Sequence, residues 1–145
     1  MEFSGFQVSL LMTIATYTMP RSFNGMVIPI SVQSCYIRDY CLRNLLQFSL
    51  PITEMCKPLS FVALHQIIQE TSASFDELII IVCSLFVFEE ILEIPSFPRE
   101  LLGNICIHSV LENSILDFGE VLSYIEEAKD IQSLENSLFD LSDLY

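Results

Sequence analysis

The stretch SASFDELIIIVCSLFVFEEILEI, residues 72–94, decides the fold that the sequence predicts. From Leu78 to Phe88 only Ser84 is not apolar, and carboxylates stand on both sides of the run. The apolar run is shorter than the roughly 20 residues that a membrane-spanning helix needs. As one element from Phe75 to Leu92 it would be longer than a typical strand, which leaves a buried helix.

Local signals at both ends of this stretch favour the helix. Ser74 can cap its start, and Glu77 three residues later can reach back to complete a capping box. Pro95 and Pro98 stop it at the other end. A helix that is apolar on every side must be enclosed by other helices. We therefore predict an all-α, single-domain helical bundle of about seven to eight helices, packed around a central hydrophobic helix at about 75–93.

The rest of the chain is expected to supply the surrounding helices within one domain, residues 1–145. Residues 6–17 fit a helix or a strand equally well, and residues 18–30 read as a loop. Apolar residues at helical spacing predict helices at about 32–48, 60–70 and 99–118, with a break at Gly119, a further helical piece, and an acidic amphipathic tail at 131–145.

The charge of the chain limits its partners. The formal net charge is −13, and residues 70–145 hold sixteen acids against two bases. Nucleic acid is excluded because phosphate binding needs clustered Lys and Arg, whereas a basic partner remains open. Five cysteines without a C-x-x-C pair indicate reduced thiols and a cytoplasmic setting, and the first residues lack the basic start of a signal peptide.

Little in the sequence points to catalysis. The two histidines, His65 and His108, have no partner at metal-ligand spacing, and no phosphate-binding or nucleophile motif is present. We expect no metal, no cofactor and no enzymatic activity. Binding through a hydrophobic surface is the function that remains.

Two segments resemble the Bcl-2 family of apoptosis regulators. SFVALHQIIQETSASFDELIIIVCSLF, residues 60–86, is similar to the run from the family's short helix into its central helix, and ICIHSVLENSILDF, residues 105–118, is similar to the helix that follows. The family signature Asn-Trp-Gly-Arg falls on Ser74, Phe75, Asp76 and Glu77. The resemblance implies a groove that binds the Bcl-2-homology-3 helix of pro-apoptotic proteins and thereby inhibits apoptosis.

The groove implied by the resemblance would be lined by residues from the predicted helices. It would comprise Tyr36, Tyr40, Arg43, Leu46, Leu64, Ile68, Ser74, Phe75, Glu77, Leu78 and Ile79. Glu77 stands where the family has an Arg that pairs with an Asp of the ligand, so it would repel that Asp and narrow the choice of partners. Arg43 or Arg38 would then receive the ligand's Asp.

The resemblance further implies an anti-apoptotic role, because the chain lacks the death-inducing Leu-x-x-x-Gly-Asp pattern. Divergence of this degree is typical of viral members of the family, which act at the host–virus interface. The tail at 131–145 is too short and too acidic to anchor the chain stably in a membrane. We expect a cytoplasmic protein that pro-apoptotic partners recruit to mitochondria.

Other functions stay open beside this one. FPRELLGNICIHSVL, residues 97–111, has the Pro-x-Glu-Leu-Leu-x-x-Ile pattern of an F-box start, which would make the chain a helical adaptor of a ubiquitin ligase. An enzyme with an unrecognised site is the third alternative. A homodimer is compatible with each, because the apolar residues 6–17 exceed what one small core can cover.

Overall fold

The computed structural model describes residues 12–74, 77–99 and 105–142 and shows an α/β fold. The elements in chain order are β1 (Met12–Thr18), α2 (Ile30–Arg43), β2 (Ile52–Thr53), α3 (Val62–Ser74), β3 (Glu77–Val82), the 3₁₀ helix η1 (Leu85–Glu93), β4 (Ile105–Ser109), β5 (Ser114–Asp117) and α4 (Phe118–Ser142). The predicted all-α helical bundle is therefore wrong.

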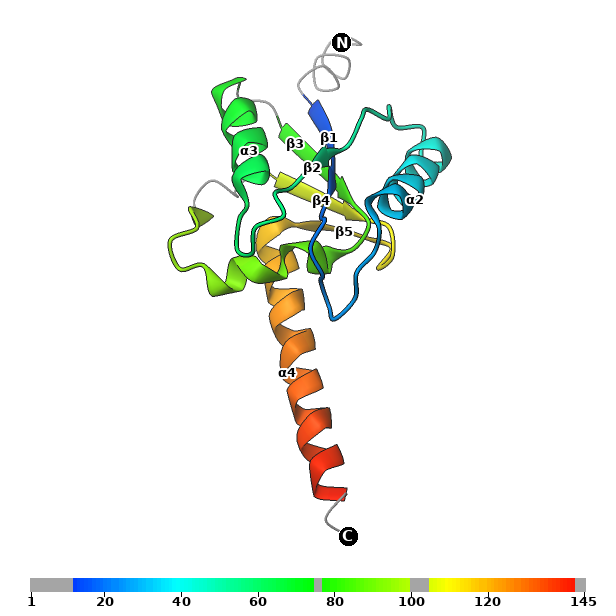
Figure 1. Cartoon of the computed structure of the whole chain (residues 1–145). Coiled ribbons are helices and arrows are strands. Elements are labelled where there is room, and N and C mark those ends of the chain that lie inside the picture. The colour runs from blue at the N-terminus through cyan, green and yellow to red at the C-terminus, as the bar shows by residue number, and fades with distance from the viewer. Residues whose placement is uncertain (1–11, 75–76, 100–104, 143–145) are drawn as a thin grey trace, which may run out of the picture.

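A five-stranded mixed sheet forms the centre of the fold, in the strand order β2-β1-β3-β4-β5 (Figure 1). The four strands from β2 to β4 are parallel, and β5 returns antiparallel to β4. The register pairs Ile14 with Ile79 and Ile80 with Ile107, which places β3 in the middle. Parallel strands need covered faces, and helices pack on both sides of this sheet.

The stretch that decided the prediction is a strand followed by a 3₁₀ helix, so the central helix at 75–93 is wrong. Four consecutive β-branched residues, Ile79 to Val82, favour the pleated conformation of β3, and all four are buried. The chain turns at Ser84, whose side chain accepts a hydrogen bond from the Phe86 N–H at 3.2 Å and caps η1. The apolar run is buried, as expected, but as two short elements.

The helix expected at 99–118 is also wrong, because its described part forms the β4–β5 hairpin. Ile107 pairs with Leu116 and Ser109 with Ser114 across the two strands. Asn113 in the turn has a φ of 49°, a left-handed conformation that Asn tolerates better than most residues. The part of the F-box-like segment 97–111 that the structure describes therefore contains strand β4.

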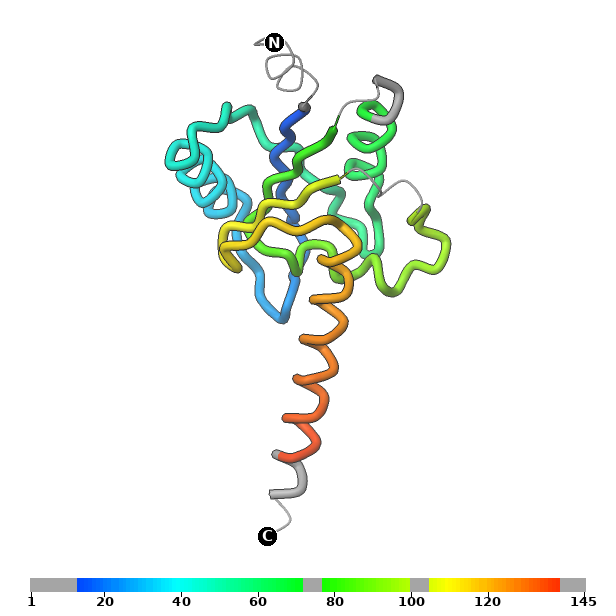
Figure 2. The backbone as a smooth tube through the Cα atoms, turned by 180° about the vertical axis from the view of Figure 1, so that it is seen from behind, coloured from blue at the N-terminus to red at the C-terminus, as the bar shows by residue number. Residues whose placement is uncertain are grey.

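The sheet separates two hydrophobic layers. The larger layer lies under α3, η1 and the first half of α4, and the smaller one lies under α2 (Figures 1 and 2). Strand residues alternate between them, since Leu78, Ile80 and Val82 face the larger layer while Ile79 and Ile81 face α2.

Helix α4 begins with a capping box and leaves the body of the molecule at about its middle. The Asp117 N–H donates to Glu120 Oε1 at 3.1 Å, and the Glu120 N–H donates to Asp117 Oδ1 at 2.8 Å. Gly119 lies inside this first turn, so the predicted break there is wrong. The amphipathic tail expected from residue 131 is helical as far as Ser142, and it projects away from the sheet (Figure 1).

Candidate functional site

Topology singles out one edge of the sheet as the first place to look for a site. The chain crosses from β1 to β2 in one direction and from β3 to β4 in the other, so the direction reverses between β1 and β3. In open α/β sheets, ligands bind outside the carboxyl ends of the strands at such a reversal. We call this region, formed by the segments that follow β1 to β4, the carboxyl edge.

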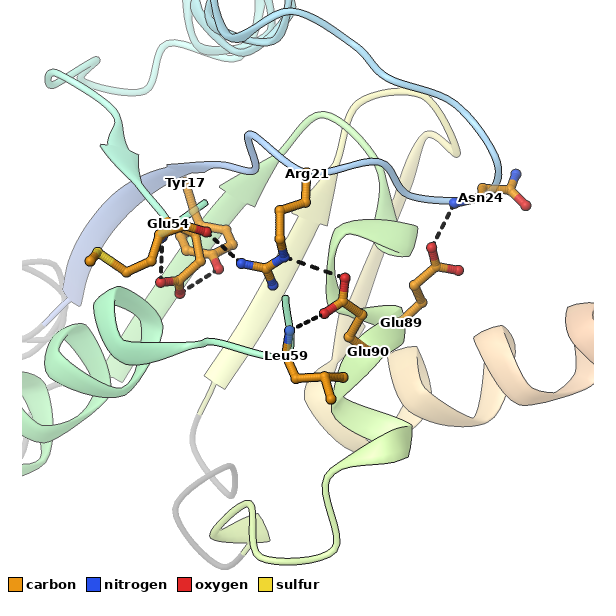
Figure 3. A network of polar contacts seen from close by, with 8 residues as sticks. Tyr17, Arg21, Asn24, Glu54, Leu59, Glu89 and Glu90 are labelled. Atoms are coloured by element: carbon orange, nitrogen blue, oxygen red, sulfur yellow. Dashed lines mark hydrogen bonds and ion pairs between the residues drawn. The ribbon is translucent and has the colours of Figure 1, made fainter. Parts of the chain in front are cut away.

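Glu54, directly after β2, fills one anion position at the carboxyl edge. Its side chain is 3% exposed and accepts hydrogen bonds from the Tyr17 hydroxyl at 2.8 Å and from the backbone N–H groups of Met55, Ala63 and Leu64 at 2.8 to 3.1 Å. The last two N–H groups belong to the start of α3, where an anion is favoured by unpaired donors and the helix dipole. Figure 3 shows the Glu54 side chain beside the Tyr17 hydroxyl. The carboxylate of Glu54 therefore occupies the position that a ligand phosphate would take.

Tyr17 stays protonated beneath this carboxylate. Its ring is fully buried and stacks on Phe88 with 5.7 Å between ring centroids. Burial, followed by the charge of Glu54, raises the pKa of Tyr17 well above its usual value. The hydroxyl therefore stays protonated near neutral pH and donates its hydrogen bond to Glu54.

Arg21, three residues after β1, makes several contacts at the same edge that fix its side chain. Its guanidinium pairs with Glu90 at 3.3 Å and donates to the Met55 carbonyl (Figure 3). It also lies 5.3 Å from the centre of the Phe61 ring. The Arg21 side chain is 8% exposed, and its Nη2 atom has no hydrogen-bond partner. Because that atom is enclosed, the guanidinium holds η1 against the loops and does not face solvent.

Two carboxylates of η1, Glu89 and Glu90, accept hydrogen bonds from the loops that follow β1 and β2. Glu90 also accepts the Leu59 N–H at 2.6 Å, and Glu89 accepts the Asn24 N–H at 2.7 Å (Figure 3). Lys129 of α4 pairs with Glu89 at 3.4 Å. These contacts join the segments after β1 and β2, η1 and the middle of α4 into one network.

Glu112, in the turn between β4 and β5, accepts hydrogen bonds at the start of η1, on the β3 side of the point where the chain direction across the sheet reverses. It accepts hydrogen bonds from the Ser84 hydroxyl and the Leu85 N–H, both at 2.8 Å, and from the Ser109 hydroxyl. Burial, and then the Glu112 charge, raise the pKa of Cys83 to about 11. The Cys83 thiol is therefore neutral at physiological pH and is a poor nucleophile.

At the carboxyl edge, two carboxylates of the chain accept hydrogen bonds from the starts of the neighbouring helices. Glu54 and Glu112 stand at the starts of α3 and η1, where an external anion would bind. Among residues 12–74, 77–99 and 105–142 there is no cluster of three or more His, Cys, Asp and Glu side chains arranged to hold a metal ion. The hydrogen bonds of Glu54 and Glu112 therefore stabilise the fold at this edge.

The α2 face holds a smaller polar feature. The Tyr40 hydroxyl and His108 Nδ1 lie 2.8 Å apart, and either group can donate the hydrogen bond. Burial lowers the pKa of His108, which favours the neutral imidazole. Beside this pair lies a cavity of about 490 Å³, lined by Arg43 and Ser114 among others, and the Ser114 hydroxyl has no hydrogen-bond partner.

The residues of the predicted groove do not line one surface. Tyr40, Leu46 and Ile79 pack in the layer under α2, whereas Leu64, Ile68 and Leu78 pack in the layer on the other side of the sheet. All of these except Leu46 are buried, and Leu46 is half-buried. They are core residues of two separate layers.

The other predicted groove residues lie at the ends or on the outside of elements. Tyr36 is exposed on α2, and Arg43 ends α2 in an exposed ion pair with Asp39 at 2.9 Å. Glu77 is exposed at the start of β3, Ser74 is the last residue of α3, and Phe75 lies outside the described residues. Ser74 and Glu77 therefore belong to different elements and cannot form the predicted capping box.

The far half of α4 carries exposed apolar residues that are not among the predicted groove residues. Ile131, Leu134 and Leu138 are 58%, 65% and 66% exposed and recur at the spacing of one helix face. We call these three residues the α4 stripe. The sequence predicts an amphipathic tail from residue 131, and the structure shows that these three apolar residues of the tail are exposed.

The comparisons with known proteins add no assignment. No protein-family model matches the chain, and no curated protein matches it. Within the described parts of the chain, none of the helices combines the length and the apolar character needed to span a bilayer. The geometry of the α4 stripe and of the carboxyl edge is therefore what a proposed function rests on.

Proposed function

We propose that this chain is a protein-binding module that docks a helix of a partner on the α4 stripe. The observation that carries the proposal is the exposure of Ile131, Leu134 and Leu138, each well over half exposed, on a helix that projects from the body. Apolar side chains at positions three and four apart are the pattern by which helices recognise one another.

The body of the molecule is not placed to cover the stripe. Ile125 of α4 is fully buried against the sheet, and Leu134 follows nine residues later. At about 100° per residue, nine residues turn the helix by two and a half turns, so Leu134 lies on the side opposite Ile125. Bending α4 back onto the sheet would therefore bury the opposite face and leave the stripe in water.

Helix stability also argues for a partner. The segment after Lys129 has about a dozen helical residues, which is the length at which an isolated helix is marginal in water. No basic residue lies in its last turn to balance the helix dipole. A partner that buries the stripe would supply the tertiary packing that stabilises most helices in proteins.

Inhibition of apoptosis remains a prediction that no observation tests. The expected partners, pro-apoptotic proteins that present an amphipathic death helix, have the general chemistry that the stripe can bind. The groove of an all-α bundle is not available for them, because the fold is α/β. A death-helix peptide is accordingly one ligand to test among several, and the ubiquitin-ligase alternative has no stronger support.

The experiment measures binding of a designed amphipathic helix to the purified full chain. The peptide has about four heptads, Leu and Ile at the apolar positions and Gln at the flanking positions, so that only apolar packing can drive binding. We expect measurable binding by titration calorimetry. Leu134→Glu should weaken this binding by about tenfold or more, because it places a charge in the packed seam.

Ser133→Glu is the matched control. It introduces the same charge one residue away, about 100° around the helix and off the stripe. We expect its affinity to stay within about threefold of the unmodified chain. The proposal fails if the peptide does not bind to the folded chain, or if the two variants weaken binding equally.

A further inference from the structure

We infer that the occupant of the α4 stripe is a helix of a different protein whose flanking positions are basic, rather than a second copy of this chain. This inference rests on the proposed function and deepens it by naming the chemistry of the partner. Its evidence is the charge around the stripe, which is independent of the apolar residues that form it.

The stripe fits a heptad frame with acids beside the seam. With Ile131 and Leu138 at position a and Leu134 at position d, Asp130 falls at position g and Glu135 at position e. Positions e and g flank the apolar seam and face the flanking residues of the partner helix. Both charged flanks of the stripe are therefore negative.

No base on the far half of α4 offsets these acids. Residues 130–145 contain four acids and neither Lys nor Arg. The nearest base, Lys129, pairs with Glu89 of η1 and so points back to the body. The helix dipole adds partial negative charge at the same end of α4. A docked helix therefore meets a negative field along the whole stripe.

A second copy of the chain fits this surface poorly. In a parallel pair, position g of one helix lies beside position e of the other, so Asp130 of one copy would face Glu135 of its partner. Symmetry repeats the same contact on the other side. Each like-charge contact at an exposed site is weak, so charge selects between helices of equal apolar fit rather than creating affinity.

A membrane surface is disfavoured by the same charges. Helices that lie on bilayers combine an apolar face with Lys and Arg, because cytoplasmic membrane surfaces are anionic. The positions that flank the α4 stripe carry acids where such helices carry bases. A helix with Lys or Arg beside its apolar seam satisfies both the apolar and the electrostatic character of this surface.

The test compares three peptides with identical seams and with Lys, Gln or Glu at the flanking positions. We expect the Lys peptide to bind about tenfold more tightly than the Glu peptide at about 0.05 M salt, with the Gln peptide between them. At about 0.5 M salt the differences should shrink to about threefold or less, since salt screens exposed charges.

Two charge variants locate the effect. Asp130→Asn combined with Glu135→Gln should remove most of the preference for the Lys peptide over the Glu peptide. Glu70→Gln combined with Glu93→Gln removes the same two charges from exposed positions on the body. That control should keep the preference, which separates a local effect at the stripe from an effect of net charge.

The outcomes separate the two proposals. Equal binding of all three peptides, each abolished by Leu134→Glu, overturns the basic partner and leaves helix docking intact. Absence of binding by all three overturns helix docking itself. Self-association in sedimentation, or flotation with anionic vesicles, overturns the inference if Leu134→Glu abolishes it, because the occupant is then a second copy or a membrane.

Discussion

The carboxyl edge of the sheet and the far half of α4 differ in how their side chains are used. The edge makes hydrogen bonds within the chain, whereas the far half of α4 exposes apolar side chains to solvent. At the edge, Glu54 and Glu112 provide acceptors for helix starts and hydroxyl groups within the same chain. On the far half of α4, Ile131, Leu134 and Leu138 face water. The hydrogen bonds at the edge stabilise the fold itself, whereas burial of the α4 stripe would stabilise the complex with the proposed partner. This contrast is why we place recognition on α4 and not at the usual ligand position of an α/β sheet.

The largest effect on stability is expected from removing the carboxylate of Glu54 at the carboxyl edge. Glu54→Ala leaves the Tyr17 hydroxyl and the first N–H groups of α3 without an acceptor in a buried place. Buried donors that lose a charged acceptor cost about 1 to 3 kcal/mol each and do not add fully. We expect the free energy of unfolding to fall by about 3 to 4 kcal/mol, measured by urea denaturation.

Glu54→Gln serves as the control because it keeps the shape and one acceptor oxygen. One of its positions now presents an NH₂ group to backbone donors, so a smaller loss of about 1 to 2 kcal/mol is expected. A free energy of unfolding within about 0.5 kcal/mol of the unmodified chain for Glu54→Ala would contradict the structural role of this carboxylate. The edge would then be free to act as a ligand site.

The second prediction compares a buried and an exposed residue of the same helix, α4. Ile125 is fully buried in the larger layer, and Leu134 is 65% exposed on the same helix. Ile125→Ala should lower the free energy of unfolding by about 2 to 4 kcal/mol, because it removes buried methylene groups and leaves a cavity. Leu134→Ala should change it by less than about 0.5 kcal/mol, since Ala is the better helix former and no packing is lost.

Denaturation at several protein concentrations checks this pair of variants. Equal losses for Ile125→Ala and Leu134→Ala would show that the stripe is covered in the isolated chain. If the loss for Leu134→Ala grew with protein concentration, a second copy would be the cover. Either outcome would remove the observation on which helix docking rests.

The sequence predicted burial well and the type of secondary structure poorly. The run from Leu78 to Phe88 is the interior of the protein, as its apolar character indicates. A strand enclosed on both faces and a helix enclosed on all sides have the same continuous apolar pattern, so periodicity does not separate them. The four β-branched residues Ile79 to Val82 indicate a strand, whereas the length of the whole apolar run favours a helix.

Local start signals were assigned to the wrong position for a related reason. Ser74 and Glu77 have the spacing of a capping box, yet they belong to α3 and β3. The capping box that forms is Asp117 with Glu120, in front of a helix that was predicted to break at Gly119. A four-residue pattern specifies a cap only where a helix follows, and long-range strand pairing decided where that was.

The binding surface was visible in the sequence only as a pattern. The spacing of Ile131, Leu134 and Leu138 predicted an amphipathic helix, and that helix forms. Whether an apolar face meets the core or the solvent depends on where the rest of the chain lies. The direction in which α4 leaves the sheet is a tertiary property that the sequence pattern of α4 does not contain.

The pair of Tyr40 and His108 on the α2 face is intermediate between the hydrogen-bonded carboxyl edge and the exposed α4 stripe. Their side chains are hydrogen-bonded inside the fold, but they lie beside a cavity that contains the unpaired hydroxyl of Ser114. Burial lowers the pKa of His108, so the unfolded chain takes up a proton at this residue at a higher pH than the folded chain does. Protonation of His108 therefore favours unfolding.

The sign of the resulting pH dependence can be checked directly. The contribution of neutral His108 is fully present above its unfolded pKa, about 6.5, and is lost as the pH falls below that value towards the lower pKa of the folded state. We expect His108→Gln to remove this part of the pH dependence, whereas Tyr40→Phe should keep it, because burial rather than the hydrogen bond causes the shift. Urea denaturation between about pH 5 and 8, with NMR titration of His108, measures both. Parallel profiles for the unmodified chain and His108→Gln would contradict this prediction, because they would mean that partial burial of the imidazole does not change its protonation between the folded and unfolded chains.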